Sequence, residues 1–422
     1  MDMVSREELD RFIQNIQGAD ENAMREAAQY AASLAAPPGS LGKLTEAAVQ
    51  LAGVTGKCAN RIERRRIIVM CADNGVVEEG VCVTPQYVTY VQAVNMTRGL
   101  TGMSALARHF GCEVEVVDVG IATPYDASAI GAVGEAPHDA SAIGAVGEAP
   151  HDASGADAVG EAPILQRRIR RGTRNMLKGP ALTTEETLQA IGVGIERARK
   201  AADDGVDVIG IGEMGIGNTT TSSAVLAALT GLDTELVTGR GAGLTDEAFL
   251  RKKEVIRRAL ELHHLARWKG GRSGAAERVT EFGGAVTAPR PEADCIDILA
   301  RVGGLDLAAM CGVYLGAAAF RIPVVIDGFI SIVAALCAVR LCPKSRDFMF
   351  PSHASVETGY MRAADEIGLA PWLHLGMRLG EGSGCPLAIQ ILEAACVLMN
   401  DMATFEKASI DDGYLDEIRS RQ

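Results

Sequence analysis

A chain of 422 residues, with 48% hydrophobic and 23% charged residues, has a globular composition and enough length for one large domain or two ordinary ones. The formal net charge of −13 argues against a surface that binds nucleic acid or an anionic membrane. Only 4% of the residues are aromatic, which leaves few platforms for stacking bases. A small anionic ligand is compatible with this charge, because local N–H groups and one or two cations can outweigh it.

The ten cysteines include no C-x-x-C pair, and most lie in apolar runs. This pattern predicts reduced thiols in a protein core and argues against a disulfide framework or a zinc site. The N-terminus is charged from its start and has no secretory hydrophobic region. The apolar, uncharged stretch at residues 307–320 is too short and too rich in Gly and Ala to span a bilayer. We therefore expect a soluble, cytoplasmic protein.

The first part of the chain reads as helices. A capping box formed by Ser5 and Glu8 predicts a first helix. Two further helices are expected over 21–34 and 44–55, the second after a rigid Pro-Pro-Gly turn. We assign residues 1–60 to the N-terminal part of a small helical domain, 61–350 to an α/β nucleotide-binding domain, and 351–422 to a C-terminal region.

An alternation of strands and helices begins at a buried strand over 67–71. This strand ends at Asp73 and Asn74, and polar residues at the carboxyl end of a buried strand lie where open α/β sheets place their sites. Helices over 87–98 and 100–110 and a strand over 114–119 complete a β-α-β pattern. The arginines at 64–66 are expected to form a solvated entrance to the strand.

An internal repeat interrupts this pattern. Residues 126–138 recur letter for letter at 139–151, and 152–163 is a degenerate third copy. The copies are rich in Ala and Gly and cannot bury a core of their own. We expect 126–163 to be a disordered or loosely ordered surface insertion, so His138 and His151 are not paired as metal ligands.

The stretch 210–221, GIGEMGIGNTTT, follows an apolar run at 206–209 that reads as a buried parallel strand. A glycine-rich turn between a strand and a helix brings backbone N–H groups together with the positive end of a helix dipole, which favours phosphate. Its four glycines would let the backbone approach a ligand. One acid, Glu213, lies inside the turn, where a pure phosphate cradle would not favour it.

The remaining elements continue the α/β pattern. Glu381 lies in a second glycine-rich loop, and Pro386 suits the first turn of a buried helix to about Met399. Lys252 and Lys253 lie on a cationic helix that follows the glycine ladder 239–243, and lysines in such a helix usually form a solvated face. The other expected elements are a helix over 183–202 with a capping-box start at Thr183 and Glu186, helices over 246–262 and 330–342, and a strand over 322–326.

Several catalytic patterns can be compared with these loops. Gly210-x-Gly212-x-x-Gly215 matches the dinucleotide fingerprint weakly, because Asp233 lies in a turn and not at a strand end. The absence of G-K-[ST] excludes a Walker P-loop. His353 beside two serines lacks a G-x-S-x-G elbow, and no cluster has metal-ligand spacing. Glu213 and Glu381 remain, either as helix caps or as catalytic acids.

Seven motifs occur in a fixed order and cover nearly the whole chain except 126–163. The chain closely resembles the nicotinate-nucleotide:5,6-dimethylbenzimidazole phosphoribosyltransferase family of cobalamin lower-ligand synthesis. The motifs are PPGSLGKL, ADNGVVEEGV, GEMGIGNTT, GRGAG, PVVIDGF, SHASVE and RLGEGSG.

The resemblance implies a parallel, Rossmann-like sheet flanked by helices, a smaller helical domain built from both chain ends, and a homodimer. It also implies transfer of the 5-phosphoribosyl group from nicotinate mononucleotide to a benzimidazole, giving α-ribazole 5′-phosphate and nicotinate without a metal or cofactor. A carboxylate with a raised pKa would take the azole proton.

By resemblance Glu381 is the general base and Glu213 a second carboxylate that assists. The residues implied to hold the donor are Gly215, Gly217, Asn218 and Thr219, with Lys252 and Ser355 lining the nucleotide site. The acceptor pocket would contain Cys82, Gln92 and Leu379.

Three residues depart from the family pattern. Asn74 replaces a common His, Cys82 a common Ser, and Asp306 a common Glu. The first two adjoin the expected acceptor pocket, so adenine or a phenol remains open as the acceptor. A nicotinamide-dinucleotide oxidoreductase built on the Gly210 loop, or a non-catalytic nucleotide-binding protein, are the alternatives from other classes.

Overall fold

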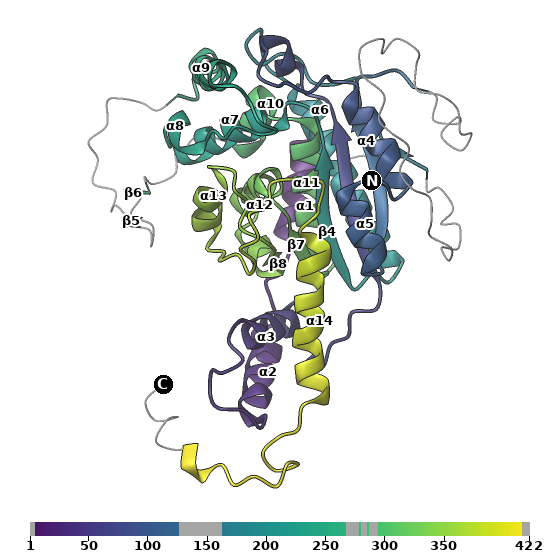
Figure 1. Ribbon diagram of the computed structural model, residues 1–422, viewed down its shortest axis with the longest axis vertical. Helices are drawn as coiled ribbons and strands as arrows, with labels where there is room; N and C mark the ends of the chain where they lie inside the picture. The colour runs from purple at the N-terminus through teal and green to yellow at the C-terminus, as the bar shows by residue number, and fades with distance from the viewer. Residues whose placement is uncertain (1–4, 126–162, 267–277, 280–284, 287–293, 416–422) are drawn as a thin grey trace.

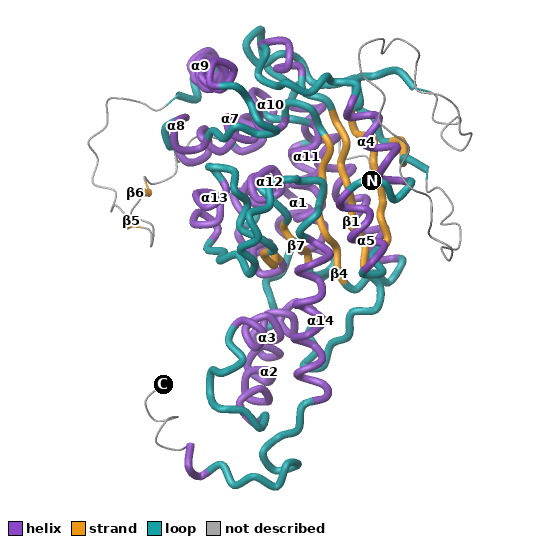
Figure 2. The backbone as a smooth tube through the Cα atoms, in the orientation of Figure 1, coloured by secondary structure: helices purple, strands orange, loops and turns teal. Residues whose placement is uncertain are grey.

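The computed structural model describes residues 5–125, 163–266, 278–279, 285–286 and 294–415. Its centre is a six-stranded sheet of order β3-β2-β1-β4-β7-β8, in which every neighbouring pair is parallel. Figure 2 shows the strands in orange, with helices around them. These strands are β1 (Arg65–Ala72), β2 (Glu113–Gly120), β3 (Leu165–Gln166), β4 (Val208–Met214), β7 (Val324–Ile326) and β8 (Met349–Pro351). The predicted parallel α/β fold is confirmed.

Helices cover both faces of the sheet, which explains why its central strands read as unbroken apolar runs. On one face lie α11 (Leu305–Ala319) and α12 (Phe329–Leu341). On the other lie α4 (Val88–Thr97), α5 (Gly102–His109) and α14 (Cys385–Asp401) (Figure 1). The carboxyl ends of all six strands therefore open onto one edge, bordered by helix starts.

Outside this sandwich, α6 (Thr184–Asp203) packs closely on α11. The predicted capping box of Thr183 and Glu186 is present at its start. A second group of helices lies beyond the edge of the sheet (Figure 1). It comprises α7 (Asn218–Thr230), α8 (Thr234–Val237), α9 (Asp246–Leu262), α10 (Cys295–Val302) and α13 (Tyr360–Ile367).

Reciprocal glycines allow α6 and α11 to approach each other. A Cβ on Gly312 would lie 2.0 Å from the carbonyl oxygen of Ile191, and one on Gly194 would lie 1.9 Å from that of Ala309. We expect Gly312→Ala to destabilise the protein by about 1–3 kcal/mol through overpacking, lowering its thermal midpoint. Turnover well below that midpoint should be unchanged, and an unaltered midpoint would contradict the close packing.

A small helical unit extends from the body, where α2 (Glu21–Ser33) and α3 (Lys43–Thr55) pack beside the far half of α14 (Figure 1). Both chain ends contribute to it, because the N–H of Ala35 donates to the carbonyl of Ala403 at 2.9 Å. Helix α1 (Arg6–Gln14) instead contacts the α/β body, where the Phe12 ring lies 6.3 Å from that of Phe320. The boundaries at residues 60 and 350 stay a prediction.

Sequence reasoning missed several short elements, namely β3, β8, α8 and α13. A two-stranded antiparallel pair, β5 (Arg278–Val279) with β6 (Ala285–Val286), was also not anticipated. All ten cysteines are free and eight are buried, as predicted. Nearly all of the repeat insertion lies outside the described residues.

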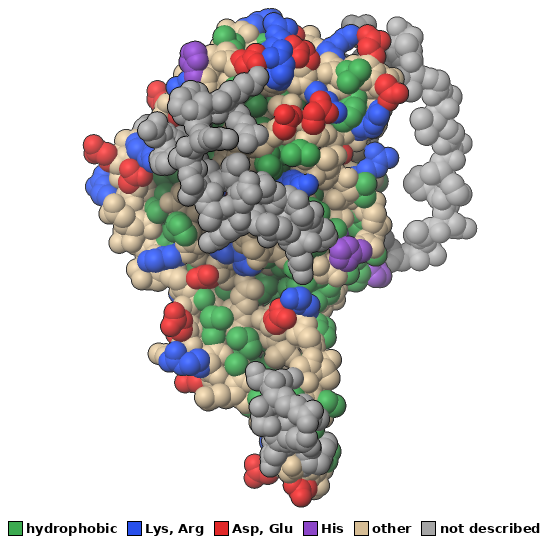
Figure 3. Space-filling model, turned by 90° about the vertical axis from the view of Figure 1, so that its left-hand side faces the viewer, with side chains coloured by type: hydrophobic (Ala, Val, Ile, Leu, Met, Phe, Trp, Pro, Cys, Tyr) green, Lys and Arg blue, Asp and Glu red, His purple; other side chains and the backbone are tan. Residues whose placement is uncertain are grey.

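No helix of the described ranges is long and apolar enough to cross a membrane. On the face shown in Figure 3, acidic and basic side chains are interspersed over the body. The described part of that face therefore presents no continuous basic stripe of the kind that follows a nucleic-acid backbone.

Candidate functional site

Glu213 projects from the carboxyl end of a central strand. Strand β4 runs on through Gly210 and Gly212 to Met214, so the expectation that the glycine turn begins at Gly210 is wrong. These two glycines allow other segments of the protein, and not a ligand, to approach the strand closely. A Cβ on Gly210 would lie 2.6 Å from that of Cys385, and one on Gly212 would lie 2.2 Å from the carbonyl oxygen of Glu381.

A cavity of about 230 Å³ opens at this end of the sheet. Residues from six separate segments line it, which explains why the sequence alone could not assemble it. They are Cys82, Thr84, Val88 and Gln92, residues 213–219, Gly241 and Ala242, residues 328–330, Ser355 and Glu357, and residues 378–381. All of the predicted site residues lie on this cavity wall except Lys252.

Glu381 occupies a strained turn above Glu213. Gly380, Glu381 and Gly382 have φ values of 79°, 64° and 92°, a left-handed run that disfavours a residue with a Cβ. The backbone N–H of Glu381 donates to Oε1 of Glu213 at 3.4 Å. The two acids, 168 positions apart in the chain, therefore share one site, as expected.

The carboxylate of Glu381 meets the start of α5. The hydroxyl of Thr101 and the backbone N–H of Met103 hydrogen-bond to it, which lowers its pKa against the larger raising effect of burial. The net result is a raised pKa. Oxygen Oε2 is buried and accepts no hydrogen bond from any described residue. The residue itself lies on the cavity wall, where its carboxyl group can meet a ligand.

Glu213 is held differently. Its Oε2 accepts a hydrogen bond from Nδ2 of Asn218, while Oε1 faces the N–H of Glu381. Burial raises its pKa to about 8, and the negative charge of Asp306 adds to this effect. Nδ2 of Asn218 also donates to Asp306 at 3.2 Å. Glu213 is therefore mostly protonated at neutral pH, with both oxygens engaged.

A short glycine turn links β4 to α7. Gly217, at φ 94°, precedes Asn218, and no side chain caps the first turn of the helix. The N–H groups of Asn218 and Thr220 donate within the turn, to the carbonyls of Gly215 and Gly217, so the positive end of the helix dipole is what favours an anion here. The predicted anion cradle consists of Gly215, Gly217 and the start of α7.

Lys252 lies directly behind this cradle. Its Nζ donates to Oγ1 of Thr219 at 2.8 Å and to the carbonyl of Gly239 at 3.0 Å, which uses two of its three protons. The side chain is fully buried, whereas a solvated helix face was the ordinary expectation for both lysines. Burial lowers the pKa of Lys252 to about 8. Ser355, also buried, lies on the cavity wall near Gly328.

The side of the cavity expected to hold the acceptor is less polar. Cys82 and Gln92 are half-buried there, and Leu379 is 56% exposed. Sequence reasoning did not single out Phe329, Glu357 or Arg378, although each lies within or beside a quoted motif. Phe329 could have been found from its position, because it follows Asp327 and Gly328 at the carboxyl end of the buried strand β7.

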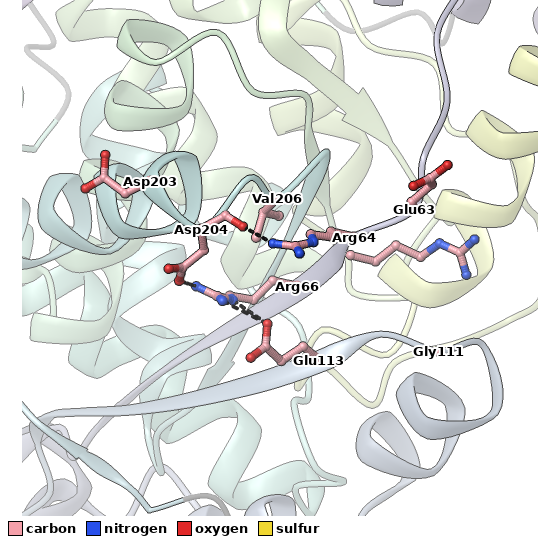
Figure 4. A pocket seen from close by; sticks show the side chains of 9 residues that line it. Glu63, Arg64, Arg66, Gly111, Glu113, Asp203, Asp204 and Val206 are labelled. Carbon is pink, nitrogen blue, oxygen red and sulfur yellow. Dashed lines mark hydrogen bonds and ion pairs between the residues drawn. The ribbon is translucent and has the colours of Figure 1, made fainter.

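A wide cavity of about 740 Å³ lies at the opposite edge of the sheet (Figure 4). Its central side chain, Arg66, is only 6% exposed and forms ion pairs with Glu113 at 2.8 Å and Asp204 at 2.9 Å. The expectation of a solvated strand entrance is wrong for this arginine. Its charge is already neutralised within the protein, so this cavity is a structural ion network and not the site.

A family model described as phosphoribosyltransferase matches residues 16–410. The nicotinate-nucleotide–dimethylbenzimidazole phosphoribosyltransferase of Clostridium perfringens, strain ATCC 13124, is 41% identical over 414 residues, which cover 98% of each protein. The chain belongs to this phosphoribosyltransferase family. The enzyme of the same name from Clostridium tetani is 40% identical, again over 98% of each protein.

The crystal structure of CobT from Thermus thermophilus agrees with this assignment. It matches with a TM-score of 0.74 and 35% sequence identity, covering 93% of this chain and 100% of that one. The resemblance inferred from the seven motifs is confirmed, and with it the transferase class.

This phosphoribosyltransferase family member carries its three sequence departures at or beside the site. Asp306 and Asn74 are both fully buried, and the side chain of Asn74 lowers the pKa of Asp306 against the larger raising effect of burial. Asp306 contributes to the raised pKa of Glu213, although sequence reasoning assigned it no role. Cys82 lies on the cavity wall itself. Among the described residues no group of His, Cys, Asp and Glu is placed to hold a metal ion.

Proposed function

We propose that this protein transfers the 5-phosphoribosyl group of nicotinate mononucleotide to 5,6-dimethylbenzimidazole or a related base. The products are α-ribazole 5′-phosphate and nicotinate. Family membership supports this reaction. The observation that carries its mechanism is the position of Glu381, which lies on the cavity wall with a carboxyl pKa that burial raises.

The chemistry requires a base for the acceptor. As one azole nitrogen attacks C1′, the bond from C1′ to the pyridinium nitrogen breaks, and its electron pair neutralises the leaving nicotinate ring. The proton on the other azole nitrogen passes to the carboxylate of Glu381. A positioned base of this kind contributes typically about 10²–10⁴-fold to the rate.

Glu213 would act as the protonated partner of this base. A pKa of about 8 keeps its carboxyl neutral, so it adds no negative charge beside the donor phosphate. It also orients the backbone of Glu381. The donor phosphate would lie on the cradle formed by residues 215–219, with Lys252 behind it and Ser355 opposite. Cys82, Gln92 and Leu379 would contact the acceptor ring.

The oxidoreductase alternative loses its support, because Gly210 and Gly212 lie within β4 and pack against protein. They cannot form the phosphate turn of a dinucleotide site. Adenine or a phenol as acceptor remains open, since Cys82 and Asn74 depart from the family pattern.

The direct test incubates purified protein with nicotinate mononucleotide and a panel of azoles, purines and phenols. We expect nicotinate release that depends on an acceptor, with an azole riboside phosphate detected by mass spectrometry. Donor binding without turnover over the whole panel would favour a non-catalytic nucleotide-binding protein. We further propose a homodimer located in the cytoplasm, which the family resemblance supports; sedimentation of the purified chain tests the dimer.

The pH dependence of kcat/KM should be bell-shaped. Glu381 must be ionised to accept a proton, so the rate should rise as the pH passes its raised pKa. Lys252 is cationic only below about pH 8, and Glu213 becomes anionic in the same range, so donor affinity should fall above it. Measured over about pH 5 to 10, a profile that stays flat above pH 8 would contradict this assignment. Lys252→Arg should move the alkaline limb upward.

A further inference from the structure

Asp327 directly follows strand β7 and faces the loop that carries Glu381. Its Oδ1 accepts the backbone N–H of Gly384 at 2.7 Å, and its Oδ2 accepts that of Gly382 at 3.0 Å. The side chain is 2% exposed and does not line the cavity. Asp327 therefore contacts the catalytic loop from behind, without reaching a ligand.

The loop needs such a support because of its backbone conformation. Glu381 is held at φ 64° between two glycines that also have positive φ, an arrangement that costs about 1–3 kcal/mol for a residue with a Cβ. Such a conformation persists only where the surroundings determine it. Here Glu213 accepts the N–H of Glu381, and Asp327 accepts the next two loop N–H groups that point inward.

The carboxylate of Asp327 is not explained by an ion pair with a cation. In the described part of the chain its one ion-pair neighbour is His353, whose Nδ1 lies 3.8 Å from Oδ1. Burial lowers the pKa of His353, so this imidazole is neutral and offers no compensating charge. Burying a carboxylate without a cation is costly, and burial accordingly raises the pKa of Asp327 to about 7. The cost is understandable if the loop requires two acceptor oxygens on one side chain, which no amide or hydroxyl provides.

We propose that Asp327 is a positioning residue for the transfer reaction, clamping residues 382 and 384 so that the carboxylate of Glu381 points at the acceptor. This inference rests on the proposed function. Asp327 would act only through Glu381 and would make no contact with either substrate.

Asp327→Asn tests the clamp, because it keeps the shape but turns one acceptor oxygen into an NH₂ group facing a backbone N–H. We expect kcat to fall by about 10²-fold, since a misplacement of about 1 Å can have that effect, with KM for the donor changed less than about threefold. In a Glu381→Gln background the same substitution should change kcat by less than about threefold, because both act through one group.

A matched control separates positioning from stability. Asp118 is also a buried aspartate near the end of a strand, and its Oδ1 accepts the N–H groups of Gly120 and Ile121 at 2.9 and 2.8 Å; unlike Asp327, it also forms an ion pair with Arg168 at 2.6 Å. It does not line the cavity, so Asp118→Asn should lower the thermal midpoint but leave kcat unchanged. Hydrogen exchange should accelerate over 380–384 in Asp327→Asn and not in Asp118→Asn.

Each outcome bears on the proposal. A lowered thermal midpoint with unchanged kcat in Asp327→Asn would overturn it, as would independent, multiplicative losses in the double variant. If hydrogen exchange of residues 380–384 is unchanged in Asp327→Asn, the clamp is contradicted, even if kcat falls in that variant. If the wild-type protein itself transfers no phosphoribosyl group to any acceptor, the proposed function fails, whereas the exchange result still decides whether Asp327 holds the loop.

Discussion

Replacing Glu381 by glutamine should lower kcat by about 10²–10⁴-fold, the usual contribution of a general base. The amide keeps the size of the side chain but cannot take the azole proton. The buried Oε2 accepts no hydrogen bond from the described residues, so its replacement should cost little stability. Initial rates of nicotinate release with dimethylbenzimidazole, together with thermal midpoints, measure both expectations.

Glu213→Gln provides the comparison. Its carboxyl is already protonated at neutral pH and hydrogen-bonded at both oxygens, so its loss should reduce kcat less than the loss of Glu381. If Glu213→Gln lowers kcat more than Glu381→Gln does, then Glu213 and not Glu381 is the general base. Near-normal turnover in Glu381→Gln would remove Glu381 as the base.

Lys252→Met should raise KM for nicotinate mononucleotide by about 10- to 100-fold. The substitution keeps the apolar stem but removes a charge behind the cradle, and a hydrogen bond to a charged group contributes about 1.5–3 kcal/mol. It also releases Thr219, which the lysine holds at 2.8 Å. Steady-state kinetics at about pH 7 would measure the change, where a lysine with a pKa of about 8 is charged.

The adjacent lysine is the matched control. Lys253 forms an ion pair with Glu235 and lies 4.3 Å from the centre of the Phe249 ring, away from the cavity. Lys253→Met should leave KM unchanged. Nicotinate riboside, which lacks the phosphate, should be used equally poorly by the wild type and by Lys252→Met. An equal loss on both donors would mean that Lys252 supports the fold and not phosphate binding.

Much of this molecule was predictable because its signals are local. The capping boxes at Ser5 and Thr183 start helices as expected, and the apolar run at 67–71 forms a buried strand. Each pattern reports a preference of neighbouring residues. All of the residues that the family resemblance singled out, except Lys252, line one cavity; their roles there stay a prediction.

The glycines show where local reasoning failed. A glycine run after a strand reads as a turn, but β4 continues through Gly210 and Gly212. Only the fold reveals that the loop of Glu381 packs against this strand, so that a Cβ on Gly212 would collide with it. The requirement for glycine therefore came from a segment far along the chain.

The charges show the same limit. Arg66 and Lys252 read as solvated cations, yet both are buried, one in an ion network and one beneath a phosphate-type cradle. Burial depends on what packs above a side chain, which no sequence window contains. The pKa of Glu213 likewise depends on Asp306, from another element.

The sequence by itself determined the parallel α/β class and the family, and it singled out the two acids that we propose to act. Only the tertiary structure decided how those acids differ. It leaves one oxygen of Glu381 without a partner among the described residues and surrounds Glu213 with hydrogen bonds and a second buried acid. The reason is that a carboxyl group's proton affinity is set by burial and by neighbours in space, which the fold alone brings together.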